Sequence, residues 1–133
     1  MKKTILLLVL VFFGCANPKK DIENLICKDS IQYWNYEWPH YRSKFYGFTF
    51  SFNKNGKLLK YSFNKETNVR RFFGDEDFGY GNWNVTKDSI LTFMGAREKI
   101  TSYSEDTIHA IKMETGEKIM FIRVNKTELN IEE

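Results

Sequence analysis

The sequence predicts an all-β domain, an antiparallel up-and-down meander of about eight strands that closes into a small barrel, with a short N-terminal helix. From residue 30 onward, large apolar side chains alternate with polar or small ones, which is the period of a half-buried strand. Aromatic residues make up 17% of the chain, more than is usual, and they favour strands. Tight-turn sequences separate the alternating segments and leave no room for crossover helices, so neighbouring strands are expected to run antiparallel.

Residues 1–14 are typical of a secretory signal peptide. Two lysines precede an apolar run over residues 5–13, and the run ends just before Cys15. As a helix this run would be about 14 Å long, well short of the roughly 30 Å core of a bilayer, so it does not predict a membrane span.

Residues 12–15 resemble a bacterial lipobox, in which the cysteine is acylated and becomes the new N-terminus. We therefore expect acyl chains on Cys15 to anchor the protein in a membrane. An ordinary signal peptide with a structural Cys15 is the alternative.

Residues 15–29 are expected to hold a polar tether and a short helix. Ala16 stands where an Asp commonly retains such lipoproteins in the inner membrane, so an outer-membrane protein facing the periplasm is expected, with surface exposure as the alternative. Ile22, Leu25 and Ile26 are spaced i, i+3 and i+4, which predicts one or two helical turns with one apolar stripe.

Composition and charge exclude several classes of protein. Removing residues 1–14 leaves 119 of the 133 residues, enough for one domain, and lowers the formal charge from +3 to +1. A nucleic-acid partner is therefore not expected. With two cysteines and two histidines, the chain lacks the ligands of a structural zinc site, and no metal or cofactor is expected. If Cys15 is acylated, Cys27 has no partner in the chain and should be buried, although a disulfide with Cys15 or a reactive Cys27 is an alternative.

The barrel domain is assigned to residues 30–126, and residues 127–133 to a C-terminal tail. Aromatic side chains alternate without a fault over residues 46–52, and Asn55-Gly56 then supplies a tight hairpin turn before a return strand over residues 59–63. Closing the meander into a barrel removes exposed edges, and a two-layer sandwich is the alternative. The other alternating segments are residues 30–38, 69–73, 79–85, 89–94, 97–103, 107–113 and 118–124.

Four segments occur in an order that resembles a known family. They are Gly81-Asn82-Trp83-Asn84-Val85, Asp88-Ser89-Ile90-Leu91-Thr92-Phe93, Ser104-Glu105-Asp106-Thr107-Ile108 and Phe121-Ile122-Arg123. The lipocalin-like domains of small bacterial lipoproteins carry a Gly-x-Trp strand, a Leu-Thr-Leu strand, a Ser-x-Asp-Thr-Leu turn and a Phe-x-Arg strand in this order. The resemblance covers roughly residues 45–124. It implies the barrel and the lipid anchor, and it does not imply a ligand.

Alternation also predicts which side chains face the barrel interior. An eight-stranded barrel can hold one small ligand or be filled by its own side chains. Strands of about seven residues that carry bulky aromatics leave little volume, which favours a filled core. The candidate interior residues are Phe48, Phe50, Tyr61, Phe63, Trp83 and Phe93.

The last strand carries one charged residue on its apolar face. Arg123 alternates with Ile119 and Phe121, so the phase of the strand points a guanidinium toward the interior. In lipocalins an arginine near the end of the last strand stacks on a tryptophan of the first, and the resemblance implies such a closure between Arg123 and Trp34 or Trp38. The alternative is that Arg123 extends from the rim into solvent.

Three classes of function are compatible with these observations. The favoured one is a monomeric, non-catalytic binding module for a small apolar ligand or an envelope component. The alternative is an interaction protein, inhibitor or immunity-type lipoprotein with a filled core that acts through loops such as residues 70–78. An enzyme is not expected and no catalytic residue is assigned. Residues 75–77 lack the ligand spacing of a calcium loop, and no nucleophile signature lies beside His40 or His109.

Overall fold

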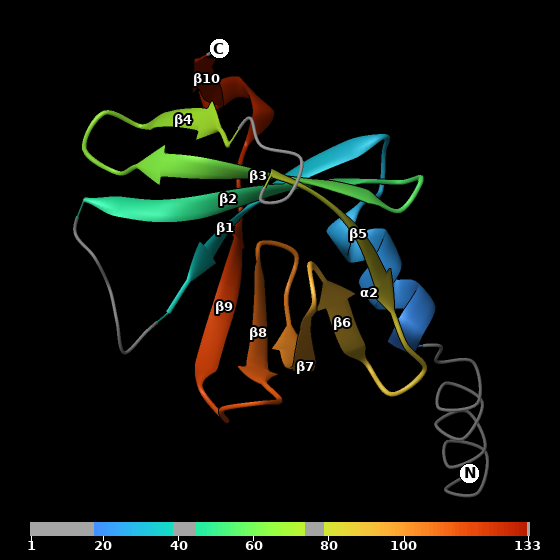
Figure 1. The fold of residues 1–133 in the computed structure, drawn as a ribbon. Helices are drawn as coiled ribbons and strands as arrows, with labels where there is room; N and C mark the ends of the chain where they lie inside the picture. The colour runs from blue at the N-terminus through green and yellow to red at the C-terminus, as the bar shows by residue number, and fades with distance from the viewer. Residues whose placement is uncertain (1–17, 39–44, 74–78, 133) are drawn as a thin grey trace, which may run out of the picture.

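A computed structural model describes residues 18–38, 45–73 and 79–132 of the chain (Figure 1). The predictions for the signal peptide, Cys15, His40 and residues 75–77 lie outside the described residues. One helix, one short 3-10 helix and ten strands form within the described part: α2 (Pro18–Ile26), β1 (Ile31–Glu37), β2 (Tyr46–Asn53), β3 (Lys57–Asn64), β4 (Val69–Phe72), β5 (Tyr80–Val85), β6 (Ile90–Phe93), β7 (Ala96–Tyr103), β8 (Thr107–Lys112), β9 (Lys118–Arg123), η1 (Lys126–Glu128) and β10 (Asn130–Glu132).

Eight of the strands form a closed antiparallel barrel, which confirms the predicted fold class. Around the barrel the strands follow the order β1, β2, β3, β5, β6, β7, β8 and β9. The first and last strands pair directly, with Trp34 opposite Arg123 and Tyr36 opposite Phe121. Pairing of β3 with β5 completes the wall on the other side. The barrel therefore has no open seam along these eight strands.

Strand β3 has two partners along the same edge, and this takes β4 out of the barrel. Lys57 to Leu59 pair with β5, whereas residues 61–64 pair with β4. Strands β2, β3, β4 and β10 consequently lie together at the top of Figure 1, above strands β6 to β9. The segment over residues 69–73 is therefore a strand as predicted, but it extends the sheet instead of completing the barrel wall.

Residues 127–132 carry regular structure where the sequence suggested a tail. The Asn125 side chain caps η1 by accepting from the Thr127 N–H at 3.1 Å. Strand β10 then pairs in parallel with β4, whose outer edge would otherwise present unpaired N–H and C=O groups. A strand of three residues is too short to show alternation, which is why the pattern missed it.

The phase predicted for β3 is wrong. Residues directly opposite one another in an antiparallel pair share a face, and Phe50 lies opposite Lys60 while Thr49 lies opposite Tyr61. Phe50 belongs to the core, so Lys60 points inward and Tyr61 points outward. Phe63 is also on the outer face, where the Arg70 guanidinium lies 4.0 Å from the centre of its ring.

A second buried layer on that outer face explains the error. Arg70 from β4 is 1% exposed, and it donates hydrogen bonds to Thr49 Oγ1 at 2.9 Å and Asn35 Oδ1 at 3.1 Å. The Tyr61 ring packs against Tyr33 and Phe72. Arg70 is thus a buried structural residue and not part of an exposed loop, and β3 carries apolar side chains on both faces.

One half of the barrel interior is filled with apolar side chains. The helix α2 forms on the predicted stripe, and Ile22 and Ile26 are buried against the core. Cys27 is also buried there and unpaired, and burial raises the pKa of its thiol. The core cluster that these residues join also contains Trp34, Phe52, Leu58, Val85, Leu91, Ile100, Ile108, Ala110, Ile119 and Phe121.

Candidate functional site

The opposite end of the barrel is open and holds a pocket of about 490 Å³. Its walls come mainly from inward-facing positions near the ends of several strands. Tyr36 and Trp38 lie at the end of β1, Phe48 and Phe50 near the start of β2, and Lys112 at the end of β8. The remaining lining residues are Lys60, Tyr80, Phe93, Met94, Ala96 and Glu98.

The walls of this open-end pocket are mainly aromatic and packed against each other. The centre of the Tyr36 ring lies 4.5 Å from that of Trp38, 5.7 Å from Phe50 and 6.2 Å from Phe93, all in edge-to-face arrangements. Such packing fixes the rings in place. The pocket is therefore a preformed apolar surface of the size that small-molecule sites usually have.

Glu98 places a carboxyl group in this aromatic pocket. Its side chain is fully buried, at 0% exposure, and its Oε1 accepts a hydrogen bond of 2.6 Å from the Tyr36 hydroxyl. Its Oε2 has no hydrogen-bond partner among the described residues. Burial raises the pKa of Glu98 to about 7, although the Tyr36 hydrogen bond and the charge of Lys112 act in the opposite direction. Burial, reinforced by Glu98, also raises the pKa of Tyr36.

Two lysines line the same pocket and rest on its rings. Lys60 Nζ lies 4.2 Å from the centre of the Phe48 ring and 5.0 Å from that of Phe73. Lys112 Nζ lies 5.4 Å from the centre of the Trp38 ring. In the described part of the chain neither ammonium has a carboxylate within ion-pair distance. Burial lowers the pKa of Lys60.

The filled end of the barrel carries the predicted closure residues. The Arg123 guanidinium lies 4.9 Å from the centre of the Trp34 ring. It also donates to Leu25 O at 3.0 Å and to Glu105 O at 2.8 Å. Trp34 Nε1 donates to Ile26 O at 2.9 Å. The two side chains thus satisfy backbone carbonyls at the C-terminal end of α2, which have no partner within the helix.

The other candidates from the sequence separate into three groups. Phe48, Phe50 and Phe93 line the open-end pocket, as does Trp38, which is not near Arg123. Trp83 is half-buried outside the pocket, where its ring packs on Phe52 at 5.5 Å and its Nε1 donates to Asn53 O at 2.8 Å. Tyr61 and Phe63 lie on the outer face, so they do not line the interior.

Three polar residues of the site were not predicted from the alternation along the strands: Lys60, Glu98 and Lys112. Glu98 alternates with Ala96 and Ile100, and that is the signal that could have found it, since a charged residue on an apolar face indicates a buried charge. Lys60 was hidden by the wrong phase of its strand.

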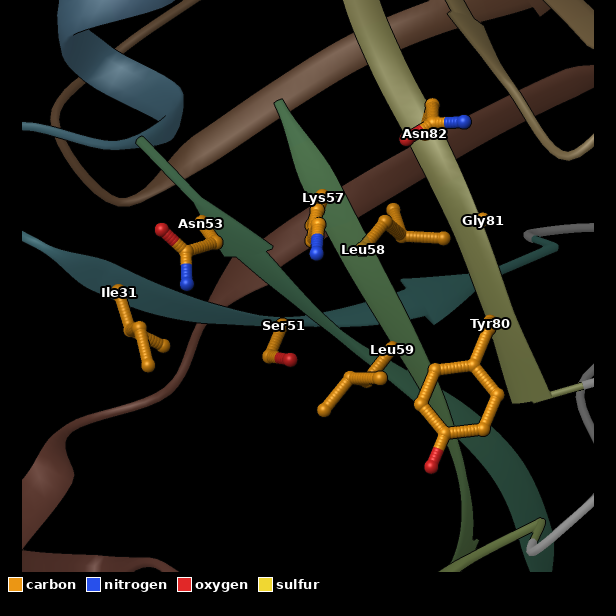
Figure 2. A pocket seen from close by; sticks show the side chains of 9 residues that line it. All are labelled: Ile31, Ser51, Asn53, Lys57, Leu58, Leu59, Tyr80, Gly81 and Asn82. Atoms are coloured by element: carbon orange, nitrogen blue, oxygen red, sulfur yellow. The ribbon is translucent and has the colours of Figure 1, made fainter. Parts of the chain in front are cut away.

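A second depression, of about 450 Å³, lies outside the barrel wall (Figure 2). Figure 2 shows Leu59 beside the Tyr80 ring, and these two residues are paired across β3 and β5. Lys57 is the one charged residue in its lining, which otherwise comprises Ile31, Ser51, Asn53, Leu58, Gly81 and Asn82. Because no buried polar group is left without a partner there, the open-end pocket is the stronger candidate site.

Comparison with protein-family models, with curated proteins and with solved structures found no match to this chain. Within the described residues no helix has the length and apolar character needed to cross a membrane. No group of three or more potential metal-binding side chains occurs in that part of the chain either.

Proposed function

We propose that the protein is a lipid-anchored envelope lipoprotein whose barrel is a non-catalytic binding module, and that a small, largely apolar molecule binds in its open end. One observation carries the proposal: the open-end pocket combines aromatic walls with a buried carboxyl oxygen that has no hydrogen-bond partner in the part of the chain that the structure describes. Pockets of this size with few convergent polar groups are typical of small-molecule sites. The lipocalin-like resemblance supports the barrel and the lipid anchor, and it does not imply a ligand.

Filling the pocket tests this function. N-phenyl-2-naphthylamine is an uncharged apolar dye whose fluorescence rises on leaving water, and it can be titrated into the full chain. Ala96 lines the pocket, whereas the side chain of its neighbour Arg97 is exposed. We expect Ala96→Phe to weaken binding at least about tenfold and Arg97→Phe to leave it unchanged, because only the first ring occupies the pocket.

Both variants keep the same N-terminal segment, so any dye bound there contributes equally to each titration. Dye binding that Ala96→Phe leaves unchanged, or an absence of binding to the unmodified chain, would contradict the proposed function.

The lipid anchor rests on the sequence alone. The apolar run over residues 5–13 and the lipobox-like residues before Cys15 support acylation of that cysteine, and Ala16 supports the outer membrane as its destination. We expect palmitate to label the protein, and Cys15→Ser to abolish labelling and release the protein into the soluble fraction. Cys27→Ser is the matched control, because the buried Cys27 thiol should not be acylated. Labelling that survives Cys15→Ser would contradict the anchor.

A protein partner is the second candidate for the bound molecule. Phe45, Tyr46, Phe73 and Tyr80 expose aromatic surface, and Tyr46 and Tyr80 line depressions that share residues with the open end. Exposed aromatic residues are enriched in protein interfaces. If a partner binds here, Tyr46→Ser should weaken that complex while dye binding in the open-end pocket persists, because Tyr46 does not line that pocket.

A further inference from the structure

We propose that the open-end pocket selects an amphipathic organic anion, one whose ring system lies between the aromatic walls, whose N–H or O–H group donates to Glu98 Oε2, and whose anionic group lies at Lys60 and Lys112. This inference rests on the proposed function and names the class of ligand for the same pocket. Three observations carry it.

The first is a carboxyl oxygen without a hydrogen-bond partner, among the described residues, on a residue that lines the pocket. Glu98 lines the pocket at 0% exposure, and the Tyr36 hydroxyl occupies Oε1. Oε2 is the acceptor that remains. An acceptor removed from water without a partner destabilises the empty site, so a ligand with a correctly placed donor gains more than a purely apolar one.

The second is the balance of charge around the pocket. Lys60 and Lys112 bring two positive charges to the lining, and Glu98 is the one acidic side chain among the described lining residues. A cationic ligand would add a third positive charge, whereas an anionic one would give both ammonium groups an opposite charge.

The third is the separation of these groups along the pocket. Glu98 is fully buried, whereas Lys60 and Lys112 are partly exposed. Lys60 directly follows the last residue of β3 that pairs with β5, and Lys112 is the last residue of β8. The donor of the ligand should therefore enter first, and its anionic group should stay at the rim.

A set of three related dyes separates these contacts. The compound 2-anilinonaphthalene-6-sulfonate carries an N–H donor in the middle of the molecule and a sulfonate at one end. Its N-methyl derivative lacks the donor, and N-phenyl-2-naphthylamine lacks the sulfonate. Each can be titrated by fluorescence into the full chain and its variants.

The donor contact predicts a specific pattern. At a pH above the Glu98 pKa of about 7, where the carboxyl is ionised, we expect N-methylation to weaken binding to the unmodified protein by about tenfold or more, the usual scale for losing a hydrogen bond to a charged group. In Glu98→Leu the acceptor is gone, so the two dyes should bind about equally. Because this comparison is made within each variant, a general change in the pocket cancels.

The anionic contact is tested in the same way. The double variant Lys60→Met, Lys112→Met should weaken the sulfonate dye about tenfold or more relative to the uncharged dye, so that the ratio of their two affinities reports the anionic contact. Lys57→Met is the matched control on the same strand, because Lys57 lines the outer depression instead. The Lys57→Met variant should bind all three dyes with the same affinities as the unmodified protein.

Equal affinities for the donor dye and its N-methyl derivative in the unmodified protein would overturn the proposal, and so would sulfonate binding that depends on Lys57 rather than on Lys60 and Lys112. In both cases, loss of the uncharged dye in Ala96→Phe would still support the proposed function. If none of the dyes binds, both the ligand class and the function are wrong.

Discussion

The charged side chains at the two ends of the barrel differ in how far their hydrogen-bonding groups find partners within the protein. At the filled end Arg123 stacks on Trp34 and donates to the Leu25 and Glu105 carbonyls. At the open end, within the described residues, one oxygen of Glu98 has no hydrogen-bond partner, and the Lys60 ammonium lies on aromatic rings with no carboxylate in ion-pair distance. Arg123 thus joins the helix to the barrel, whereas Glu98 and Lys60 remain available to a molecule in the pocket.

This difference in hydrogen-bond partners distinguishes polar groups with a structural role from polar groups with a proposed functional role. A buried polar group normally finds a partner within the protein, and Arg123 does so at the C-terminal end of α2. A buried polar group without a hydrogen-bond partner is uncommon in native proteins, and a functional role is one explanation for it. Substitutions at the filled end should therefore change stability, whereas substitutions at the open end should mainly change binding and pH dependence.

Removing the Trp34 side chain should have the largest effect on stability. Trp34 is 0% exposed, and Trp34→Ala also loses the hydrogen bond to Ile26 O. We expect the free energy of unfolding to fall by about 3 to 5 kcal/mol in urea titrations. Trp38→Ala at the open end should cost clearly less, because its ring is only partly buried. Equal losses at the two ends would contradict the distinction between them.

Glu98 should make stability depend on pH. Its pKa is about 7 in the folded protein against an ordinary 4.5, so between these values the folded state holds a proton that the unfolded state releases. Stability should therefore fall as pH rises through this window, by about 2 to 3 kcal/mol between pH 5 and pH 8. Glu98→Gln should lack this loss. Parallel urea titrations at both pH values measure the difference between the two proteins, and identical pH profiles would refute it.

Arg123 should contribute less to the stability of the fold than Trp34, although both residues lie at the filled end of the barrel. Arg123→Ala removes the cation–π contact and the hydrogen bonds to the Leu25 and Glu105 carbonyls, which predicts a loss of about 1 to 3 kcal/mol. Arg123→Lys keeps the charge near the helix C-terminus but loses the fork of donors, so it should restore only part of the stability. Thermal unfolding of the three proteins gives the order, and an undiminished melting temperature in Arg123→Ala would show that the helix does not depend on this contact.

Lys60 should have the smallest effect on stability. Its ammonium is partly desolvated and contacts only rings among the described residues, so losing the cation–π contact in Lys60→Met is offset by relief of desolvation. The free energy of unfolding should change by less than about 1 kcal/mol. A larger loss in urea would place Lys60 among the structural residues of the barrel.

The helix and the barrel were predictable because their patterns are local. The i, i+3, i+4 stripe of Ile22, Leu25 and Ile26 gave the helix, and the unbroken alternation in β2 gave the sheet. The phase of β3 was not readable in this way. Leu58 and Leu59 are adjacent, and the outer face of this strand is itself covered by β4. Alternation identifies a half-buried strand and cannot orient one that is apolar on both faces.

The candidate site was only half predictable for a different reason. Phe48, Phe50 and Phe93 follow from alternation, and the apolar neighbours of Glu98 mark it as inward-facing. That Oε2 finds no partner, and that the barrel is filled at one end and open at the other, depends on where α2 and the side chains of eight strands meet. Contacts of that kind are set by tertiary packing and leave no periodic signal.

The most direct test of the account is an NMR titration that observes both ends of the barrel at once. The carboxyl carbon of Glu98 reports on the open end and Nε of Arg123 on the filled end. We expect Glu98 to titrate near pH 7, and 2-anilinonaphthalene-6-sulfonate to shift the Glu98 signal while leaving that of Arg123 Nε in place. A Glu98 carboxyl that titrates near 4.5, or a dye that shifts the Arg123 signal and not that of Glu98, would contradict it.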